Sequence, residues 1–401
     1  MQLVAYGAQD IYLTGNPQIT FFKVVYRRHT NFSMEEIRQT ASGTEKLGGE
    51  SNYTISRNGD LVHKMYVQYT DPGIARTSTT GSFGHSILKE IECEIGGQKI
   101  DKHYGHWLET WADLTESNVI GSIGSKADGD HAICGNPETT GIYGPTKYQR
   151  MAGIGLANTD SSTKGDTYFV PLRFWFNRNP GLALPLIALQ YHEVKIKIVF
   201  EGASSVMAGN ATDVTPQLFV QYIYLDTDER RRFAQVSHEY LIEQLQFQTE
   251  SSGKGTFTLN FNHPVKEIIW TGAAAATSTN TNGVAPKMDG TTMNPTKDAK
   301  WQLKLNGHDR TSLRHSTYYT RQQIYDYHTG YGGIQEPDSI AVYSFALKPE
   351  EHQPSGTCNF SRIDTAQLIC DKNTGGNINI YAINYNVLRI MSGMGGLAYS
   401  N

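Results

Sequence analysis

The chain has 401 residues, of which 38% are hydrophobic and 18% are charged, a composition that can bury a core and excludes disorder of the whole chain. Its formal net charge is −4, whereas proteins that bind nucleic acid usually carry a basic domain, so we expect no direct binding of nucleic acid. At about 100–200 residues per domain, the length predicts two or three domains.

The sequence predicts a protein that is made in a cytosol and is not embedded in a membrane. Residues 1–10 hold neither a cationic segment nor a long apolar core, so no secretory signal is predicted. The longest apolar stretch, residues 182–189, is interrupted by Pro185 and is far shorter than the ~20 residues of a membrane helix. Four widely spaced cysteines without a C-x-x-C pair predict free thiols and a reducing compartment. They are Cys93, Cys134, Cys358 and Cys370.

One series of sequence patterns occurs twice, in the same order in each half of the chain. It comprises residues 29–36, 92–98 and 218–225 in the first half, and residues 238–245, 302–308 and 378–385 in the second. A looser pair lies at 170–198 and 343–369. Because the repeat is far longer than the ~20–50 residues of a solenoid unit, we predict two similar domains side by side.

The N-terminal residues 1–22 are predicted to form an arm ahead of a first domain at 23–225. The arm contains several large apolar side chains, which a frayed terminus would leave in water. These are Ile11, Tyr12, Leu13, Ile19, Phe21 and Phe22. A packed arm is therefore favoured over a frayed one.

Alternation of apolar and polar residues predicts half-buried antiparallel strands in both halves. The pattern covers residues 194–200, 256–262 and 301–306, and Asn306-Gly307 is a favoured tight-turn dipeptide. Many short strands separated by turn signals favour a sandwich or a barrel. The fold class is therefore predicted to be all-β.

A short linker helix is predicted at residues 226–237, ahead of a second domain at 238–401. Asp226, Asp228 and Glu229 precede the three arginines 230–232, an order that suits the helix dipole. A linker helix is favoured here over a basic patch for nucleic acid.

Two long surface loops are predicted, at residues 108–168 and 272–300. The first is rich in Gly, Thr, Ser and Asp, and the second contains no aromatic residue. Such stretches bury little area. In a jelly roll, long loops leave the ends of the sheets, so both are expected to decorate one face of the molecule.

No catalytic residue, cofactor site or metal site is predicted. The G-x-S-x-G, H-E-x-x-H and P-loop patterns are absent, and no carboxylate pair is placed for acid–base chemistry. The Gly-rich segment 392–396 lacks the Lys-Ser/Thr ending of a P-loop, so a close-packed strand end is favoured. His103 and His106 could approach a metal in a cupin-like barrel, but a third ligand is not evident, so structural or exposed histidines are favoured.

Four tripeptides satisfy the acceptor pattern for N-glycosylation. They begin at Asn31, Asn52, Asn210 and Asn359. Because no secretory route is predicted, we expect these sites to be unused.

Several long blocks of the sequence resemble the major capsid proteins of nucleocytoplasmic large DNA viruses, above all the algal-virus and iridovirus-like members. The blocks run in order through the chain: 7–23, 55–61, 95–103, 180–195, 232–235, 238–244, 343–364 and 384–399. The resemblance implies a double jelly roll, in which one chain holds two tandem eight-stranded barrels. It further implies a homotrimer that forms a pseudo-hexameric capsomer of an icosahedral virion shell, made and assembled in the host cytoplasm.

By the same resemblance, residues 1–22 run beneath the capsomer, where they and the capsomer base would meet minor capsid, penton and cement proteins. The segments 108–168 and 272–300 depart from the relatives, so host contact is the property least transferable to this chain. Two further interpretations stay open. A tandem jelly-roll carbohydrate-binding protein, or a host-recognition spike, predicts sugar affinity without higher assembly, and a cupin-like metalloenzyme predicts stoichiometric metal.

Overall fold

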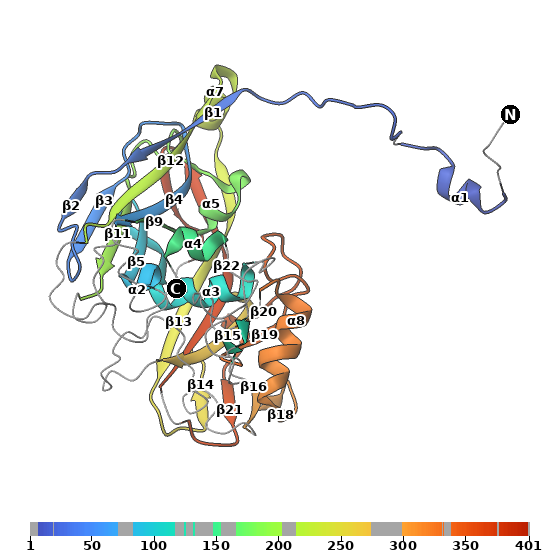
Figure 1. Cartoon of the computed structure of the whole chain (residues 1–401). Coiled ribbons are helices and arrows are strands. Elements are labelled where there is room, and N and C mark those ends of the chain that lie inside the picture. Colours follow the sequence, from blue (N-terminus) through green and yellow to red (C-terminus); the bar gives the residue numbers. More distant parts are fainter. Residues whose placement is uncertain are drawn as a thin grey trace.

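The computed structural model describes residues 7–18, 20–70, 83–116, 124–125, 131–132, 147–153, 166–202, 214–273, 299–330, 332, 338–374 and 377–399. Two β-sandwich barrels follow one another along the chain, and an N-terminal segment extends away from them (Figure 1). The prediction of an all-β fold with two tandem barrels is confirmed.

The first barrel consists of two five-stranded antiparallel sheets. One has the order β1 (Phe32–Arg38), β12 (Gln217–Leu225), β4 (Leu61–Thr70) and β10 (Leu184–Pro185), with β9 (Thr167–Pro171) also paired to β4. The other has the order β2 (Ala41–Gly43), β3 (Glu50–Thr54), β11 (Val194–Phe200), β5 (Leu88–Ile95) and β6 (Gln98–Tyr104). A separate short pair joins β7 (Gly124–Ser125) and β8 (His131–Ala132).

The second barrel also has two sheets. The first has the order β13 (His238–Glu250), β22 (Asn377–Met391), β15 (Pro264–Ala273) and β19 (Ile340–Ser344), with β20 (Cys358–Asn359) on β15 and β23 (Met394–Leu397) on β22. The second has the order β14 (Thr256–Thr258), β21 (Ala366–Cys370), β16 (Lys300–Leu305) and β17 (His308–Asp309), with β18 (Arg314–His315) on β16.

Short helices connect or cover the strands. The first half holds α1 (Asp10–Thr14), α2 (Phe83–Ser86), α3 (Gly105–Thr115), α4 (Lys147–Ala152), α5 (Trp175–Arg178) and the 3₁₀ turn η2 (Pro180–Leu182). The second half holds α7 (Thr227–Gln235), the π-helical turn η3 (Tyr318–Gln322), α8 (Gln323–Tyr327) and the 3₁₀ turn η4 (Phe360–Arg362).

The internal repeat predicted from the sequence is visible in the strand pairing. In each barrel the first strand of the pattern pairs with the Tyr-rich last strand, β1 with β12 and β13 with β22. The patterns at 92–98 and 302–308 are both hairpins, and Asn306 and Gly307 have positive φ angles of 51° and 77°, as a type I′ turn requires. The two halves therefore share one topology.

The linker helix is confirmed as α7. Asp226 caps its N-terminus, with its side chain accepting a hydrogen bond from Thr227 N at 2.7 Å. Arg230 of α7 contacts Asp60 at 3.0 Å, and Asp60 also accepts a hydrogen bond from Leu225 N. The helix is thus fastened to the first barrel before the chain enters the second.

The two hydrophobic cores exchange side chains across the boundary between the barrels. Ile242, Leu388 and Ile390 of the second barrel belong to the core of the first. Trp107 and Trp111 of the first belong to the core of the second. Shared burial of this kind fixes the barrels against each other, since a relative movement would expose apolar area on both sides.

Candidate functional site: the junction between the barrels and the exposed arm

Helix α3 lies in the junction and is buried along ten of its residues. Gly105 starts it where the backbone passes so close to His85 O and Leu88 O that a Cβ would lie 2.3 and 2.2 Å from them. Trp107, Trp111 and Leu114 then point into the core of the second barrel. Helix α3 of the first barrel thus packs its apolar face against the second barrel.

The prediction that residues 108–168 form a surface loop is therefore wrong for residues 108–115. Its other described parts include α4, whose Ala152 is buried, and the start of β9. The prediction for 272–300 is wrong at its ends, because Gly272 and Ala273 finish β15 and Ala299 is buried next to β16. Residues 274–298 lie outside the described part of the chain. The missed signal was the spacing of Trp107, Trp111 and Leu114, which places all three on one helical face.

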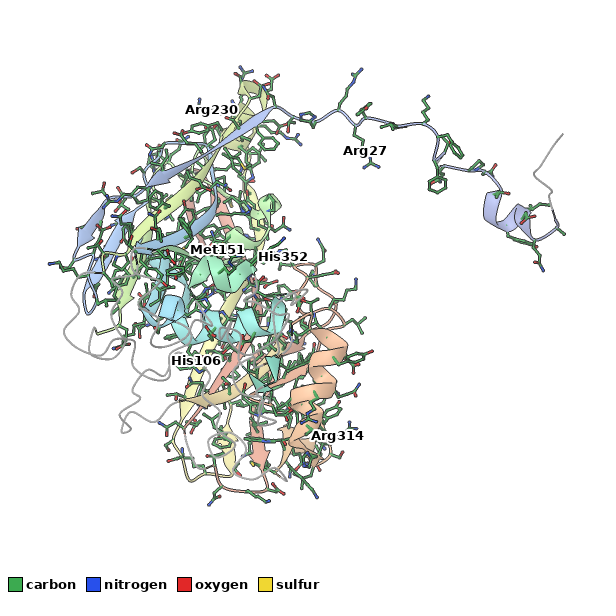
Figure 2. All side chains as sticks on the ribbon, viewed as in Figure 1. Arg27, His106, Met151, Arg230, Arg314 and His352 are labelled. Atoms are coloured by element: carbon green, nitrogen blue, oxygen red, sulfur yellow. The ribbon has the colours of Figure 1, made fainter. Side chains whose placement is uncertain are left out.

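His106 joins α3 to the second barrel through both ring nitrogens. Nδ1 lies 2.6 Å from Tyr381 Oη and Nε2 lies 3.2 Å from Gly272 O. Burial lowers the pKa of His106 to about 4, so the ring is neutral at pH 7. Because a carbonyl only accepts, Nε2 carries the proton and Nδ1 accepts a hydrogen bond from Tyr381. Figure 2 shows His106 between the barrels.

The C-terminal carbonyls of α3 find their partners in the second barrel. Gly332 N donates to Asp113 O at 2.9 Å, Gly330 N donates to Leu114 O at 2.7 Å, and Thr329 Oγ1 donates to Thr115 O at 2.9 Å. The last carbonyls of a helix have no partner within it, and leaving them unpaired in a buried place is costly. Three of the last carbonyls of α3 are therefore paired with residues more than 200 positions away, after Glu116 N has paired with Ala112 O.

A buried carboxylate, Glu243 of β13, contacts basic side chains from both barrels. Its oxygens lie 2.6 Å from Arg178 Nη1 of the first barrel, and 2.8 Å from Lys266 Nζ and 3.4 Å from His352 Nδ1 of the second. Burial alone would raise the pKa of Glu243, but Arg178, His352 and Lys266 lower it to about 2. The Arg178 guanidinium also lies 4.6 Å from the ring of Trp111, which ties the cluster to α3.

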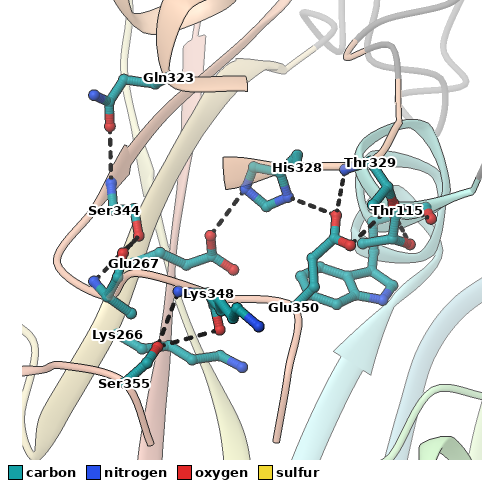
Figure 3. A network of polar contacts seen from close by, with 12 residues as sticks. Thr115, Lys266, Glu267, Gln323, His328, Thr329, Ser344, Lys348, Glu350 and Ser355 are labelled. Carbon is teal, nitrogen blue, oxygen red and sulfur yellow. Dashed lines mark hydrogen bonds and ion pairs between the residues drawn. The ribbon is translucent and has the colours of Figure 1, made fainter. Parts of the chain in front are cut away.

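A second ionic cluster is centred on His328 (Figure 3). Its Nε2 lies 3.0 Å from Glu267 Oε2, an ion pair without hydrogen-bond alignment, and its Nδ1 lies 3.2 Å from Glu350 Oε1. Burial opposes the charge on the ring, but the two carboxylates outweigh it and raise the pKa of His328 to about 9. Glu350 also accepts a hydrogen bond from Thr329 N at 2.8 Å, and the hydroxyl of Thr329 donates to Thr115 O of α3. The cluster thus holds Thr329 of the second barrel in place at the C-terminal end of α3.

The histidines weighed for a metal site have other partners. His103 Nε2 lies 2.9 Å from Asp101 Oδ2, and its ring stacks on Phe174 at 4.5 Å. No group of three or more His, Cys, Asp or Glu residues suited to a metal occurs among the described residues. Cys93, Cys358 and Cys370 are free thiols, whereas Cys134 lies outside the described residues.

Three of the four glycosylation candidates are described. Asn31 and Asn359 are exposed, and Asn52 is exposed in the middle of β3. The side-chain oxygen of Asn359 accepts a hydrogen bond from Ser361 N at 3.1 Å. Asn210 lies outside the described residues.

The N-terminal segment leaves the body of the molecule and carries its apolar side chains into solvent. Tyr12, Phe21 and Phe22 are 91%, 92% and 99% exposed. The exposed stretch reaches Asn31, directly ahead of β1, and Figure 2 shows Arg27 far from both barrels. The described part of the arm is thus unpacked within one chain, and its exposed Ile11, Tyr12, Phe21 and Phe22 side chains need a surface elsewhere, whereas Ile19 and the side chain of Leu13 lie outside the described residues. Among the described residues, none of the helices has the length and apolar character to cross a membrane.

Comparison with known proteins decides the family. Residues 20–226 match the family described as major capsid protein N-terminus, and residues 229–396 match large eukaryotic DNA virus major capsid protein. The chain belongs to the major capsid proteins of large eukaryotic DNA viruses.

Relatives of known sequence extend over the whole chain. The major capsid protein of Pyramimonas orientalis virus is 49% identical, over 100% of this chain and 99% of the relative. That of Paramecium bursaria Chlorella virus 1 is 41% identical with the same coverage. The predicted family is confirmed.

Solved capsid structures share the fold. A chain in the capsid of Paramecium bursaria Chlorella virus 1 matches with a TM-score of 0.76 and 37% identity, over 95% of this chain and 100% of that chain. The Faustovirus major capsid protein matches with a TM-score of 0.64 at 13% identity, over 96% and 94% of the two chains, which shows the fold alone. The double jelly roll is thereby confirmed. Because the relatives are structural proteins, this major capsid protein is a structural component and not an enzyme.

Proposed function

We propose that three copies of this major capsid protein associate into one capsomer of pseudo-hexagonal outline, and that such capsomers tile an icosahedral virion shell. The observation that carries the proposal is the rigid junction between two barrels of one topology. Three chains with two barrels each place six similar barrels around a threefold axis. A hexagon of this kind covers a flat facet, and its alternate edges differ because the two barrels have diverged.

The exposed arm is proposed to contact neighbouring capsomers, or minor capsid, penton and cement proteins beneath the shell. Phe21 and Phe22 offer about 150–250 Å² of aromatic area each when covered, which suits an interface and not a solvated terminus. Obligate interfaces usually bury ~2,000–5,000 Å², so an arm can supply part of that area without altering the barrels.

Assembly in the host cytoplasm is proposed as well. It is supported by the three described cysteines, which are all free, as expected in a reducing compartment. Fractionation of infected cells, with an antibody to the folded capsomer, tests this point. Accumulation of the first capsomers within the secretory pathway would contradict it.

Light scattering on the purified protein tests the trimer. A stable species of about 134 kDa, three times the 44.6 kDa chain, is expected. A strict monomer at every concentration and salt would contradict the proposal.

A further inference from the structure

The outer face of the first barrel carries a row of partly exposed aromatic side chains across β9, β4 and β12. The Tyr66 ring lies 5.6 Å from that of Phe169, edge to face, and 5.4 Å from that of Phe219, stacked. Phe169 is 36% exposed, and Tyr66 and Phe219 are half-buried. The acidic strand β1 borders the row, and its Glu36 accepts a hydrogen bond from Tyr66 Oη at 2.7 Å.

The matching row in the second barrel is buried. In the first barrel Phe219 pairs with Arg38 of the first strand and with Tyr66. In the second, Tyr381 occupies the same place, since it pairs with Phe247 of the first strand and with Ile269. Tyr381 and Ile269 are fully buried, unlike their counterparts.

The first barrel supplies the cover of that buried row. The ring of Trp107 of α3 lies 5.0 Å from Tyr381, and that of Tyr104, just before α3, lies 4.5 Å from Phe247. Helix α3 follows the β5–β6 hairpin directly. The first barrel therefore covers the outer face of the β13–β22–β15 sheet of the second barrel with helix α3, which follows its β5–β6 hairpin.

The second barrel has a helical segment in the same position. The segment η3–α8 comes after the β16–β17 hairpin and the short strand β18, much as α3 comes after the β5–β6 hairpin. Its outward side chains include Tyr325, which is 84% exposed, and Gln322. The exposed guanidinium of Arg314 stacks 4.2 Å over the ring of Tyr318 at its start (Figure 2 places Arg314 at the edge of the second barrel).

We propose that η3–α8 of one copy docks on the aromatic row of the first barrel of a second copy. The contact repeats between chains the one that α3 makes within the chain. It joins two different surfaces head to tail. Such a contact closes into a ring when the rotation that relates neighbouring copies is a whole fraction of a turn, as in a trimer. We take the partner to be a second copy because this chain itself contains the template, the packing of α3 on the outer sheet of the next barrel, and because basic Arg314 would approach the acidic strand that carries Glu35 and Glu36.

This inference rests on the trimer proposed above. Its test therefore measures both the mass of the assembly and the contact between two chains. Two variants with different affinity tags, Tyr325→Cys and Phe169→Cys, are co-expressed and treated with a short bismaleimide. Before cross-linking, we expect the assembly to have the mass of three chains. After cross-linking, we expect a product that carries both tags. Asn52→Cys replaces Phe169→Cys in the control, since Asn52 is exposed on the outer face of the other sheet of the same barrel.

The outcomes separate the two proposals. A trimer in which the mixed product is no stronger than with Asn52→Cys would overturn the docking and leave the trimer intact. A monomer would overturn both. As a second measurement, Tyr325→Glu is expected to raise the concentration for half-assembly about tenfold or more with unchanged folding, whereas Tyr325→Phe restores assembly; equal assembly of Tyr325→Glu and the parent would contradict the docking.

Discussion

Glu243 of the second barrel lies 2.6 Å from Arg178 of the first, an ion pair that crosses the junction between a buried carboxylate and a partly buried guanidinium. Glu243 is 3% exposed and also holds Lys266, which is fully buried. A buried charge cluster adds little stability over an apolar replacement, and in some proteins it specifies one arrangement of the parts that it joins. We infer that it serves to hold the barrels in one relative orientation.

Substitution Glu243→Gln removes one charge from this cluster and leaves Lys266 and Arg178 without their carboxylate. We expect a loss of about 3–5 kcal/mol in the free energy of unfolding, measured by urea denaturation, because an unpaired buried charge is costly. The matched control is Glu239→Gln on the same strand, whose exposed pair with Arg389 should contribute less than about 1 kcal/mol. Equal losses for the two variants would show that the junction does not depend on Glu243.

Substitution Tyr381→Phe removes the hydroxyl that donates to His106 Nδ1. The imidazole nitrogen would then be buried without a partner, so a loss of about 1–3 kcal/mol is expected in the same assay. Tyr224→Phe is the control, because its hydroxyl donates to Glu35 at the surface, where water can replace it. A Tyr381→Phe variant as stable as Tyr224→Phe would contradict the role given to this hydrogen bond.

The pH dependence of stability should show the contribution of the protonated His328 ring. Its pKa of about 9 in the folded chain exceeds the ordinary 6.5, so its contribution is complete below about pH 6.5 and is lost as the pH rises through 9. Glu267 of β15 and Glu350 are the carboxylates that face it. We expect the melting temperature to fall between pH 7 and 10 and the variant His328→Gln to lose part of that dependence. Parallel curves for parent and variant would refute the assignment.

How much the sequence could predict differs between the fold and the junction. Alternation along β11 and β16, and the turn at Asn306 and Gly307, were sufficient for strands and hairpins because these signals are local. The repeat located β1 and β12 in the first half and β13 and β22 in the second, but their pairing is known from the structure. Several strands could thus be located from the sequence.

The junction could not be predicted, because its partners are distant in the chain. Nothing near Glu243 indicates that Arg178, 65 positions earlier, supplies its counter-ion. His106 was weighed as a metal ligand, and only the fold brings Tyr381 to its ring. Helix α3 did carry a local signal, but the polar composition of the residues after it dominated the interpretation.

Intact mass tests the glycosylation candidates. Protein taken from virions should have the 44.6 kDa mass of the unmodified chain, because the four acceptor sites are expected to be unused. Added hexose mass that disappears in an Asn31→Gln or Asn359→Gln variant would contradict this expectation.

Removal of the arm should separate folding from assembly. A chain that begins at Asn31 keeps every strand of both barrels, and the arm lies away from the body, so the melting temperature should change by no more than a few degrees. The full chain should bind a dye for exposed apolar surface more strongly, because Phe21 and Phe22 are solvated in it.

In infected cells, the truncated protein should form trimers yet enter particles poorly when it competes with the full chain. The matched variant is the full-length Phe21→Ser, Phe22→Ser chain, which keeps the length of the arm and loses its apolar area. If both altered proteins entered particles as well as the parent, the arm would not be an assembly element. If truncation unfolded the barrels, the arm would instead belong to the fold of its own chain.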